Sequence, residues 1–276
     1  MLKKTRAEIM KDFKAQVASG KILVGVGAGT GITAKCSEKA DVDMLIIYNS
    51  GRFRMAGRGS LSGLLAYGDA NKIVQEMGQE VLPIVKKTPV LAGVNGTDPF
   101  RVMEIFLQQL KDQGFNGVQN FPTVGLIDGK FRSNLEETGM GYGLEVEMIR
   151  QAHALDMLTC PYVFDVEQAQ AMAEAGADIL VAHMGLTTKG SIGAETAVTL
   201  DDCCEKIRNI IAAGRKVNPD IMVICHGGPI ADPDDAEYVI KHVPEIDGFF
   251  GASSIERLAS ERGMTAQASA FKSIQK

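Results

Sequence analysis

The chain has 276 residues, of which 45% are hydrophobic and 23% are charged, a composition typical of a soluble globular protein with a substantial core. Lysine and arginine total 29 against 34 aspartates and glutamates, which gives a net charge of −5. Because the basic residues are also scattered, the charge argues against a nucleic-acid-binding surface, and we predict no nucleic-acid partner.

The first 20 residues are predicted to form an amphipathic helix, because Ile9, Phe13 and Val17 recur every four residues. No apolar run in the chain approaches the roughly 20 residues that cross a bilayer. We therefore expect neither a membrane anchor nor a signal peptide. The five cysteines are odd in number and lack paired C-x-x-C spacing, which favours reduced thiols and a cytoplasmic location over disulfides or structural zinc.

Eight short apolar runs rich in β-branched residues recur along the chain. Their hydrophobicity is continuous rather than alternating, which indicates strands buried on both faces, as in a parallel sheet covered by helices. The runs cover residues 22–27, 44–48, 89–94, 117–121, 158–164, 179–184, 221–226 and 248–252. Helical patterns separate them, most clearly over residues 99–113, 143–156, 166–175, 200–217 and 232–242.

This alternation predicts the fold class, a single (β/α)8 TIM barrel over residues 22–276 that follows the N-terminal helix over residues 1–20. An open doubly wound sheet is the alternative, but it normally has five or six strands. Aspartates stand at three expected helix starts: Asp98 and Asp232 precede prolines, and Asp165 follows the fifth run. We predict that all three are N-caps.

Three of the expected strand-to-helix connections are long, over residues 49–68, 122–141 and 185–199. Connections of this length are uncommon unless they are functional or disordered. In a barrel they all lie at the carboxyl ends of the strands, where active sites form. We expect them to act as lids over a pocket, with oligomer contacts or insertions without function as the alternative.

Glycines occupy every second position from Gly25 to Gly31 and share one strand face. They would leave room for a ligand there, so Gly27 is a candidate binding residue, although the same pattern also serves close packing. The run lacks the Gly-Lys-Ser/Thr of a P-loop. It also lacks the ribose-binding acid of a dinucleotide fingerprint after the second strand.

The seventh and eighth runs are followed by small residues, Gly227 and Gly228 after the seventh and Ser253 and Ser254 after the eighth. Barrels often bind phosphate at these two connections, through backbone N–H groups and a helix N-terminus. These four residues are the predicted anion site. The two serines equally suit the N-cap of the last helix.

Two of the four histidines, His183 and His226, close the sixth and seventh runs, at the catalytic rim of a barrel. Neutral imidazole near pH 7 can act as a general base or acid. Both are therefore candidate catalytic residues. A structural role is the alternative for each, and a metal site built on the pair lacks a compelling third ligand.

Other polar residues stand near the ends of further predicted strands. The candidate substrate-binding residues among them are Tyr48, Asn49, Ser50, Asn95 and Asn120.

The long connections add charged candidates. Arg52, Arg54 and Arg58 could clamp an anion, and we favour Arg52. Glu145 is the favoured acid–base carboxyl among Glu137, Glu145 and Glu195. Each single charge could equally be a solvated loop residue. Together with the polar strand ends, the set predicts a small, anionic, oxygen-rich substrate.

Several motifs together resemble a known family. They are residues 24–35 (VGVGAGTGITAK), 48–54 (YNSGRFR), 93–99 (GVNGTDP), 119–124 (QNFPTV), 139–147 (GMGYGLEVE), 182–185 (AHMG) and 226–229 (HGGP). Over essentially the whole chain they are similar to the phosphoenolpyruvate hydrolase-like TIM-barrel family, within the phosphoenolpyruvate/pyruvate barrel superfamily. The resemblance implies a TIM barrel and the hydrolysis of phosphonopyruvate or phosphoenolpyruvate.

The resemblance also bears on a metal cofactor. Lyases and mutases of the superfamily carry an Asp-x-Asp pair after the third strand, which holds Mg²⁺ through water. The corresponding residues here, 91–95 (LAGVN), lack that pair, and a hard cation prefers several carboxylate oxygens. The Ser50–Gly51 pair does resemble the superfamily's Ser-Gly, which binds the carboxylate of an α-keto acid. The resemblance thus implies a binding pocket for the carboxylate of an α-keto acid, but this chain lacks the aspartate pair that usually holds Mg²⁺ in the superfamily.

Two functions fit these observations. The first is an enzyme that acts on a small phosphorylated or α-keto acid, by hydrolysis or by cleavage of a C–P or C–C bond. The second is a non-catalytic ligand-sensing or regulatory barrel, favoured by the missing metal pair and by the association of a similar barrel with tomato mosaic virus resistance in plants. In either case we expect a homo-oligomer, because barrels with exposed helical faces commonly form symmetric assemblies.

Overall fold

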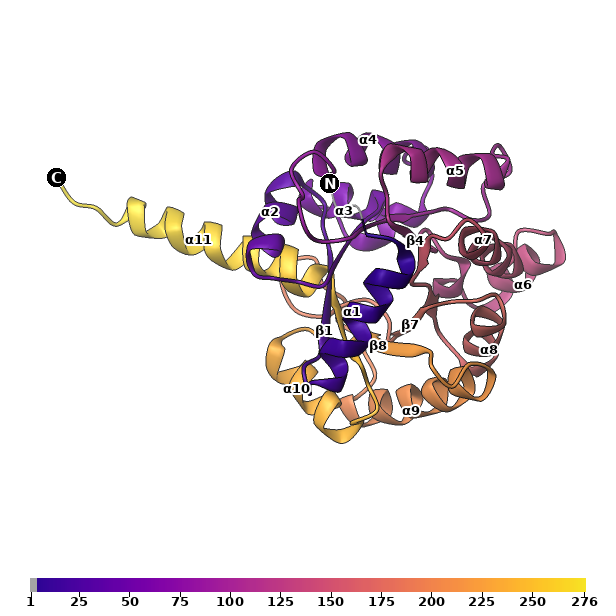
Figure 1. Ribbon diagram of the computed structural model, residues 1–276. Helices are drawn as coiled ribbons and strands as arrows, with labels where there is room; N and C mark the ends of the chain where they lie inside the picture. The colour runs from indigo at the N-terminus through magenta and orange to yellow at the C-terminus, as the bar shows by residue number, and fades with distance from the viewer. Residues whose placement is uncertain (1–3) are drawn as a thin grey trace.

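Nine parallel strands form one curled sheet in the computed structural model, which describes residues 4–276 (Figure 1). The strands are β1 (Leu23–Gly27), β2 (Met44–Ile47), β3 (Val90–Gly93), β4 (Gly117–Gln119), β5 (Leu158–Thr159), β6 (Tyr162–Val163), β7 (Ile179–His183), β8 (Met222–His226) and β9 (Gly248–Gly251). Their order in the sheet is β5-β4-β3-β2-β1-β9-β8-β7-β6. Strands adjacent in the chain are adjacent in the sheet, except that β5 and β6 stand at the two ends of this order. β1 lies beside β9, unlike the strand order of a doubly wound sheet.

The fifth predicted strand is divided into β5 and β6 by Cys160 and Pro161. The Cys160 N–H donates to the Val118 carbonyl of β4 at 3.0 Å, whereas the Pro161 carbonyl accepts the Val181 N–H of β7 at 2.8 Å. The first and last strands of the sheet order, β5 and β6, are therefore joined by Cys160 and Pro161, and each of these two residues bonds to a different end of the sheet. Proline has no N–H to continue a ladder, and the prediction of eight unbroken strands is not confirmed at this position.

Helices surround the sheet, and most of them cover its outer face (Figure 1). They are α1 (Arg6–Ala18), α2 (Gly31–Lys39), α3 (Asn49–Met55), α4 (Ala70–Val81), α5 (Met103–Gln113), α6 (Gly129–Glu137), α7 (Gly143–Ala154), α8 (Val166–Glu174), α9 (Leu200–Val217), α10 (Pro233–His242) and α11 (Leu258–Lys272). Two 3-10 turns, η1 (Ser60–Leu64) and η2 (Val124–Leu126), and one π-helical turn, η3 (Ser253–Arg257), lie between them. Within residues 4–276, no helix is both long and apolar enough to span a membrane.

Two of the three predicted aspartate N-caps, Asp165 and Asp232, are confirmed. The third is wrong, because α5 begins at Met103 and not directly after Asp98. The Asp98 carboxylate instead accepts the Phe100 N–H at 2.9 Å. This bond closes a turn over the residues that the sequence suggested as the first helical turn.

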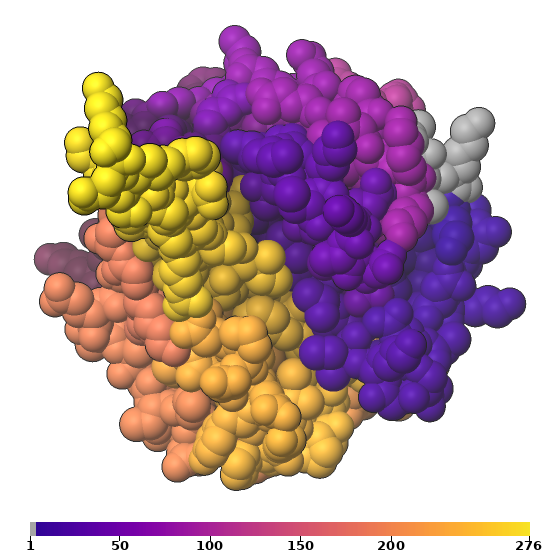
Figure 2. Space-filling model, turned by 90° about the vertical axis from the view of Figure 1, so that its left-hand side faces the viewer, coloured from indigo at the N-terminus to yellow at the C-terminus, as the bar shows by residue number. Residues whose placement is uncertain are grey.

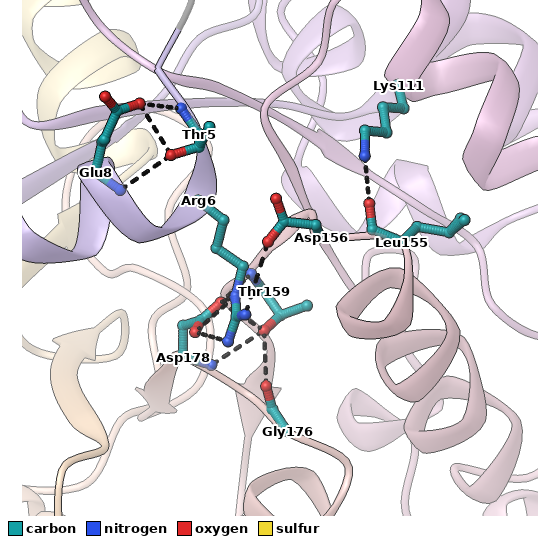
Figure 3. Close-up of polar contacts among 9 residues, drawn as sticks. All are labelled: Thr5, Arg6, Glu8, Lys111, Leu155, Asp156, Thr159, Gly176 and Asp178. Carbon is teal, nitrogen blue, oxygen red and sulfur yellow. Dashed lines mark hydrogen bonds and ion pairs between the residues drawn. The ribbon is translucent and has the colours of Figure 1, made fainter.

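The predicted N-terminal helix is α1, which lies at the amino-terminal end of the sheet. A capping box between Thr5 and Glu8 starts it (Figure 3). Ile9 and Phe13 are its buried residues, in agreement with the predicted apolar face. Because α1 covers this end, the carboxyl ends of the strands lie at the opposite end of the sheet.

A salt bridge ties α1 to the sheet. Arg6 donates from Nε and Nη2 to both carboxylate oxygens of Asp178, the residue before β7, over 2.6–3.0 Å (Figure 3). Asp178 also accepts the N–H and the hydroxyl of Thr159, each at 3.0 Å. The Asp178 side chain is 6% exposed, so the pair is shielded from solvent on the carboxylate side.

The last helix, α11, projects away from the body of the molecule (Figure 1). In Figure 2 this side is turned toward the viewer, and the C-terminal segment is drawn in yellow. Leu258 is its buried residue. Met264 and Phe271 are 69% and 66% exposed. The helix thus carries large apolar side chains into solvent.

Candidate active site

A small cavity lies at the carboxyl ends of β2, β7 and β8. Its volume of about 30 Å³ is well below the roughly 300–1,000 Å³ of a typical ligand pocket. The predicted site residues that line it are Tyr48, Ser50, His183, His226 and Ser253. The structure thus brings together residues that are far apart in the sequence.

Each of the three long connections contributes a leucine to this cavity. Leu61 comes from η1 after β2, Leu126 from η2 after β4, and Leu186 from the connection after β7. The three long connections therefore meet above the same strand ends. We call these three leucines the roof of the cavity; the rest of the lining combines aromatic rings with imidazole and hydroxyl groups.

His183 and His226 are register partners at the ends of β7 and β8. Their ring centroids are 4.7 Å apart and the ring planes are at 81°. Both rings also contact Tyr162, with centroid distances of 4.8 and 5.3 Å. Edge-to-face and stacked packing of this kind fixes the orientation of both imidazoles beside the cavity.

Backbone partners assign opposite tautomers to the two histidines. His226 Nδ1 lies 2.7 Å from the Phe250 carbonyl; because a carbonyl only accepts, Nδ1 carries the proton and Nε2 keeps its lone pair. His183 Nδ1 accepts the Gly185 N–H at 3.0 Å, so the proton of this neutral ring is on Nε2. The pair therefore has one free acceptor, His226 Nε2, and one free donor, His183 Nε2–H.

Burial keeps both imidazoles neutral at pH 7. It lowers the pKa of His226 to about 4, against the opposing effect of the hydrogen bond to Phe250. Burial also lowers the pKa of His183 well below its ordinary value, and the proximity of His226 acts in the same direction. The neutral ring is the form in which His226 can accept a proton.

Serine hydroxyl groups join the connection after β2 to the start of η3. Ser50 Oγ donates to the Ser60 carbonyl at 2.6 Å, and Ser60 Oγ lies 3.4 Å from Ser253 Oγ. The alternative prediction of a serine N-cap is wrong, because Ala252 occupies the N-cap position and no side chain caps this turn. Ser254 is half-buried and does not line the cavity.

A buried ion pair, which the sequence analysis did not favour, holds the glycine-rich segment. Arg54 of α3 donates from Nε and Nη2 to Glu256 of η3 at 2.8 and 2.6 Å, and both side chains are at most 1% exposed. The other Glu256 oxygen accepts the Gly29 N–H at 2.6 Å, and Arg54 Nη2 reaches the Gly27 carbonyl at 3.2 Å. Arg54 Nη1 is buried without a hydrogen-bond partner. The pair thus links β1, α3 and η3.

The structure does not bring Arg52 to the cavity. Its Nη1 pairs with Glu76 of α4 at 2.7 Å, and its side chain is 35% exposed. Residues two apart in a helix point in nearly opposite directions, so Arg52 faces α4 while Arg54 faces the interior. The sequence identified the arginine cluster, but not which member points inward.

Glu145 is fully buried but does not line the cavity. Its carboxylate accepts Asn120 Nδ2 at 2.6 Å and the Val124 N–H at 2.8 Å, and Asn120 Oδ1 accepts the Tyr162 N–H at 2.7 Å. Burial raises the pKa of Glu145 to about 7 despite these hydrogen bonds. Glu145 and Asn120 therefore hold both the connection after β4 and the Tyr162 wall of the cavity in place.

The two other predicted asparagines, Asn49 and Asn95, do not line the cavity. Asn49 Nδ2 donates to the Gly63 carbonyl at 2.9 Å. Asn95 lines a larger groove of about 550 Å³ between the connections after β2, β3 and β4. The structure therefore places Asn95 at a separate groove that is large enough for a small molecule.

The predicted glycines serve close packing. A Cβ at Gly27 would lie 2.8 Å from the Cβ of Ala252 and 2.9 Å from the Tyr48 hydroxyl. Gly227 and Gly228 have φ angles of 79° and 58°, which favour glycine. The Gly228 N–H donates to the Gly185 carbonyl at 2.8 Å, so this turn is bonded to the connection after β7.

Comparison with known proteins agrees with this architecture. The phosphoenolpyruvate hydrolase-like family matches residues 8–274. The chain belongs to this family. Two tomato (Solanum lycopersicum) proteins, the ToMV susceptible protein tm-1(GCR26) and the ToMV resistance protein Tm-1(GCR237), are each 60% identical over 269 residues, or 98% of the chain. The chain spans 36% of the length of each.

The family's fold extends to a solved enzyme structure. A crystal structure of phosphonopyruvate hydrolase in complex with oxalate and Mg²⁺ is 16% identical, with a TM-score of 0.60, and the match covers 99% of this chain and 89% of that one. This likeness establishes a shared α/β fold.

The residues after β3 do not fit a magnesium centre. Asp98, the first carboxylate after that strand, accepts the Asn71 amide and the Phe100 N–H, each at 2.9 Å, and pairs with Arg101 at 3.3 Å. Across residues 4–276, no group of three or more His, Cys, Asp or Glu side chains is placed to hold a metal ion.

Proposed function

We propose that this chain is an enzyme acting on a small phosphorylated or α-keto acid, by hydrolysis or by cleavage of a C–C or C–P bond. The observation that carries the proposal is the pair of buried neutral imidazoles with opposite tautomers, His183 and His226. The proposed setting is the mouth of a (β/α)8 barrel closed through the β5–β6 segment. Active sites of that fold form at the carboxyl ends of the strands.

In the proposed mechanism, His226 Nε2 is the general base and takes a proton from the substrate or from a water molecule. His183 Nε2–H donates a hydrogen bond to the carbonyl or enolate oxygen, where negative charge develops. Ser253 lines the same cavity and offers its hydroxyl group to a substrate oxygen, whereas the Ser50 hydroxyl group is donated to the Ser60 carbonyl. Glu145 acts as a positioning residue through Asn120.

The test is turnover of a panel of small acids by the wild type and by His226→Asn, with products identified by NMR. Asparagine keeps an amide donor for the Phe250 carbonyl but removes the base at Nε2. We expect kcat to fall by about 10²–10⁴ with an unchanged melting temperature, whereas the control His242→Asn on the exposed face of α10 should not change kcat. Wild-type turnover by His226→Asn would show that the base is misassigned.

A non-catalytic ligand-sensing or regulatory protein is the second candidate. The names of the tomato relatives refer to virus susceptibility and resistance and not to a reaction, and this observation favours it. It predicts that a small acid raises the melting temperature without being consumed. Thermal-shift and NMR measurements on the same samples distinguish the two candidates.

We further propose that the chain forms a homo-oligomer through α11. Met264, Phe271 and Ile274 are each at least 66% exposed, and exposed apolar clusters mark interaction sites. Light scattering should give an oligomer for the wild type and a monomer for the variant Met264→Lys/Phe271→Lys; a monomeric wild type contradicts this proposal.

We also propose a cytoplasmic location, which the five free cysteines fit, because thiols stay reduced in the cytosol.

A further inference from the structure

We infer that the cavity selects a small non-phosphorylated keto or hydroxy acid carrying an alkyl group, and rejects phosphoryl and phosphonyl groups. The juxtaposition that carries the inference is a lining in which three leucines and several aromatic rings meet two neutral imidazoles and hydroxyl groups, with no lysine or arginine among the described lining residues. The inference rests on the proposed function and narrows its substrate class.

The roof comes from three separate segments. Leu61, Leu126 and Leu186 belong to the connections after β2, β4 and β7, and all three reach the same cavity. Because the cavity of about 30 Å³ is far smaller than the roughly 300–1,000 Å³ of a typical ligand pocket, a substrate must displace these connections and then contact their leucines. An alkyl substituent gains from that contact, since each buried CH₂ contributes roughly 0.8 kcal/mol.

The walls lack the charge that a phosphoryl group requires. Such a group carries about −1.5 to −2 charges at pH 7, and buried charge must be paired. No lysine or arginine is present among the described residues that line the cavity. Both arginines of α3 are engaged elsewhere, Arg54 with Glu256 and Arg52 with Glu76, and the unpartnered Nη1 of Arg54 belongs to a side chain outside the lining.

The polar groups that do face the cavity match a less charged ligand. His183 Nε2–H is a donor for a keto oxygen, and His226 Nε2 is an acceptor for a hydroxyl or enol proton. The hydroxyl groups of Ser253 and Thr187 can solvate the single carboxylate of the same acid. One donor beside one acceptor thus fits the keto or hydroxy end of a monocarboxylic acid.

Isothermal titration calorimetry on the full chain tests this with two ligands of similar shape. They are phosphonopyruvate and 4,4-dimethyl-2-oxopentanoate, in which a tert-butyl group replaces the phosphonate. Each ligand is titrated into the protein once in the presence of EDTA and once in the presence of Mg²⁺. We expect the alkyl acid to bind at least tenfold more tightly under both conditions.

The outcomes separate this inference from the proposed function. Phosphonopyruvate binding as tightly as the alkyl acid, under either condition, overturns the inference and leaves the proposed enzyme class intact. If neither ligand binds, and pyruvate, 2-oxobutanoate and phosphoenolpyruvate do not bind either, the proposed function falls together with the inference.

A substitution in the roof provides a second measurement. Leu186→Lys places a cation where the apolar roof was, and we expect a gain of at least tenfold in affinity for phosphonopyruvate. The control is Leu144→Lys, at a side chain of α7 that is 42% exposed and outside the cavity, and it should bring no gain. A folded Leu186→Lys protein without any gain overturns the inference.

Discussion

Breaking the Arg54–Glu256 pair should destabilise the fold more than breaking any exposed ion pair. The variant Glu256→Gln keeps the shape of the side chain and an acceptor for the Gly29 N–H, but it removes the negative charge. Arg54, whose side chain is 1% exposed, is then left as a buried cation without a counter-charge. Removing one member of a buried pair typically costs about 3–5 kcal/mol, a large part of the roughly 5–15 kcal/mol that stabilises a typical domain.

The assay is urea unfolding followed by far-ultraviolet circular dichroism, because the chain has no tryptophan. The double variant Arg54→Met/Glu256→Gln should regain most of the lost stability, since the uncompensated charge is gone. The control is Lys241→Met, which breaks the exposed pair between Lys241 and Glu237 and should cost no more than about 1 kcal/mol. A Glu256→Gln variant within about 1 kcal/mol of the wild type would refute the reasoning.

Three further substitutions test other parts of the fold by the same unfolding assay. Arg6→Ala removes the charged hydrogen bonds to Asp178 and should cost about 1.5–3 kcal/mol; a cost below about 0.5 kcal/mol contradicts the role given to α1. Gly29→Ala places a Cβ 2.3 Å from a backbone carbonyl of α3 and should cost about 1–3 kcal/mol. The control is Gly59→Ala, where the added Cβ meets no atom within 4 Å and stability should change little. Equal effects of the two substitutions on stability contradict the close packing of Gly29 against α3. Burial raises the pKa of Glu145 to about 7 in the folded state, so folding favours its protonated form. The free energy of unfolding of the wild type, relative to that of Glu145→Gln, should therefore fall by about 3 kcal/mol from pH 4.5 to 7. If the difference between the two proteins does not vary with pH, the burial of Glu145 is contradicted.

The sequence predicts the strands and most helices well, because burial on both faces leaves a continuous apolar run such as Met44–Ile47. It does not predict the break at Pro161, because the run from residue 158 to 164 is apolar on both sides of that proline. The start of α5 is missed for a similar reason, since the side-chain partners of Asp98 decide it and they lie outside the local pattern.

The candidate site is predicted only in part. Placement at strand ends identifies His183 and His226, but their tautomers depend on backbone groups that the fold brings to them. Arg54 and Glu256 are 202 residues apart in the chain, so no local spacing reveals their pairing. Choosing Arg54 over Arg52 requires the phase of a short helix against its neighbours, and hydrophobic periodicity does not set that phase in a seven-residue helix.

The central claim is that the two cavity histidines are neutral and carry their protons on opposite nitrogens. Long-range ¹H–¹⁵N NMR of the histidine-labelled protein at pH 7 tests it most directly, with the two rings assigned from His183→Gln and His226→Asn. We expect a proton on Nδ1 of His226 and on Nε2 of His183, and no imidazolium signal from His226 until the pH approaches 4. A charged ring at pH 7, or the same tautomer at both residues, would contradict it.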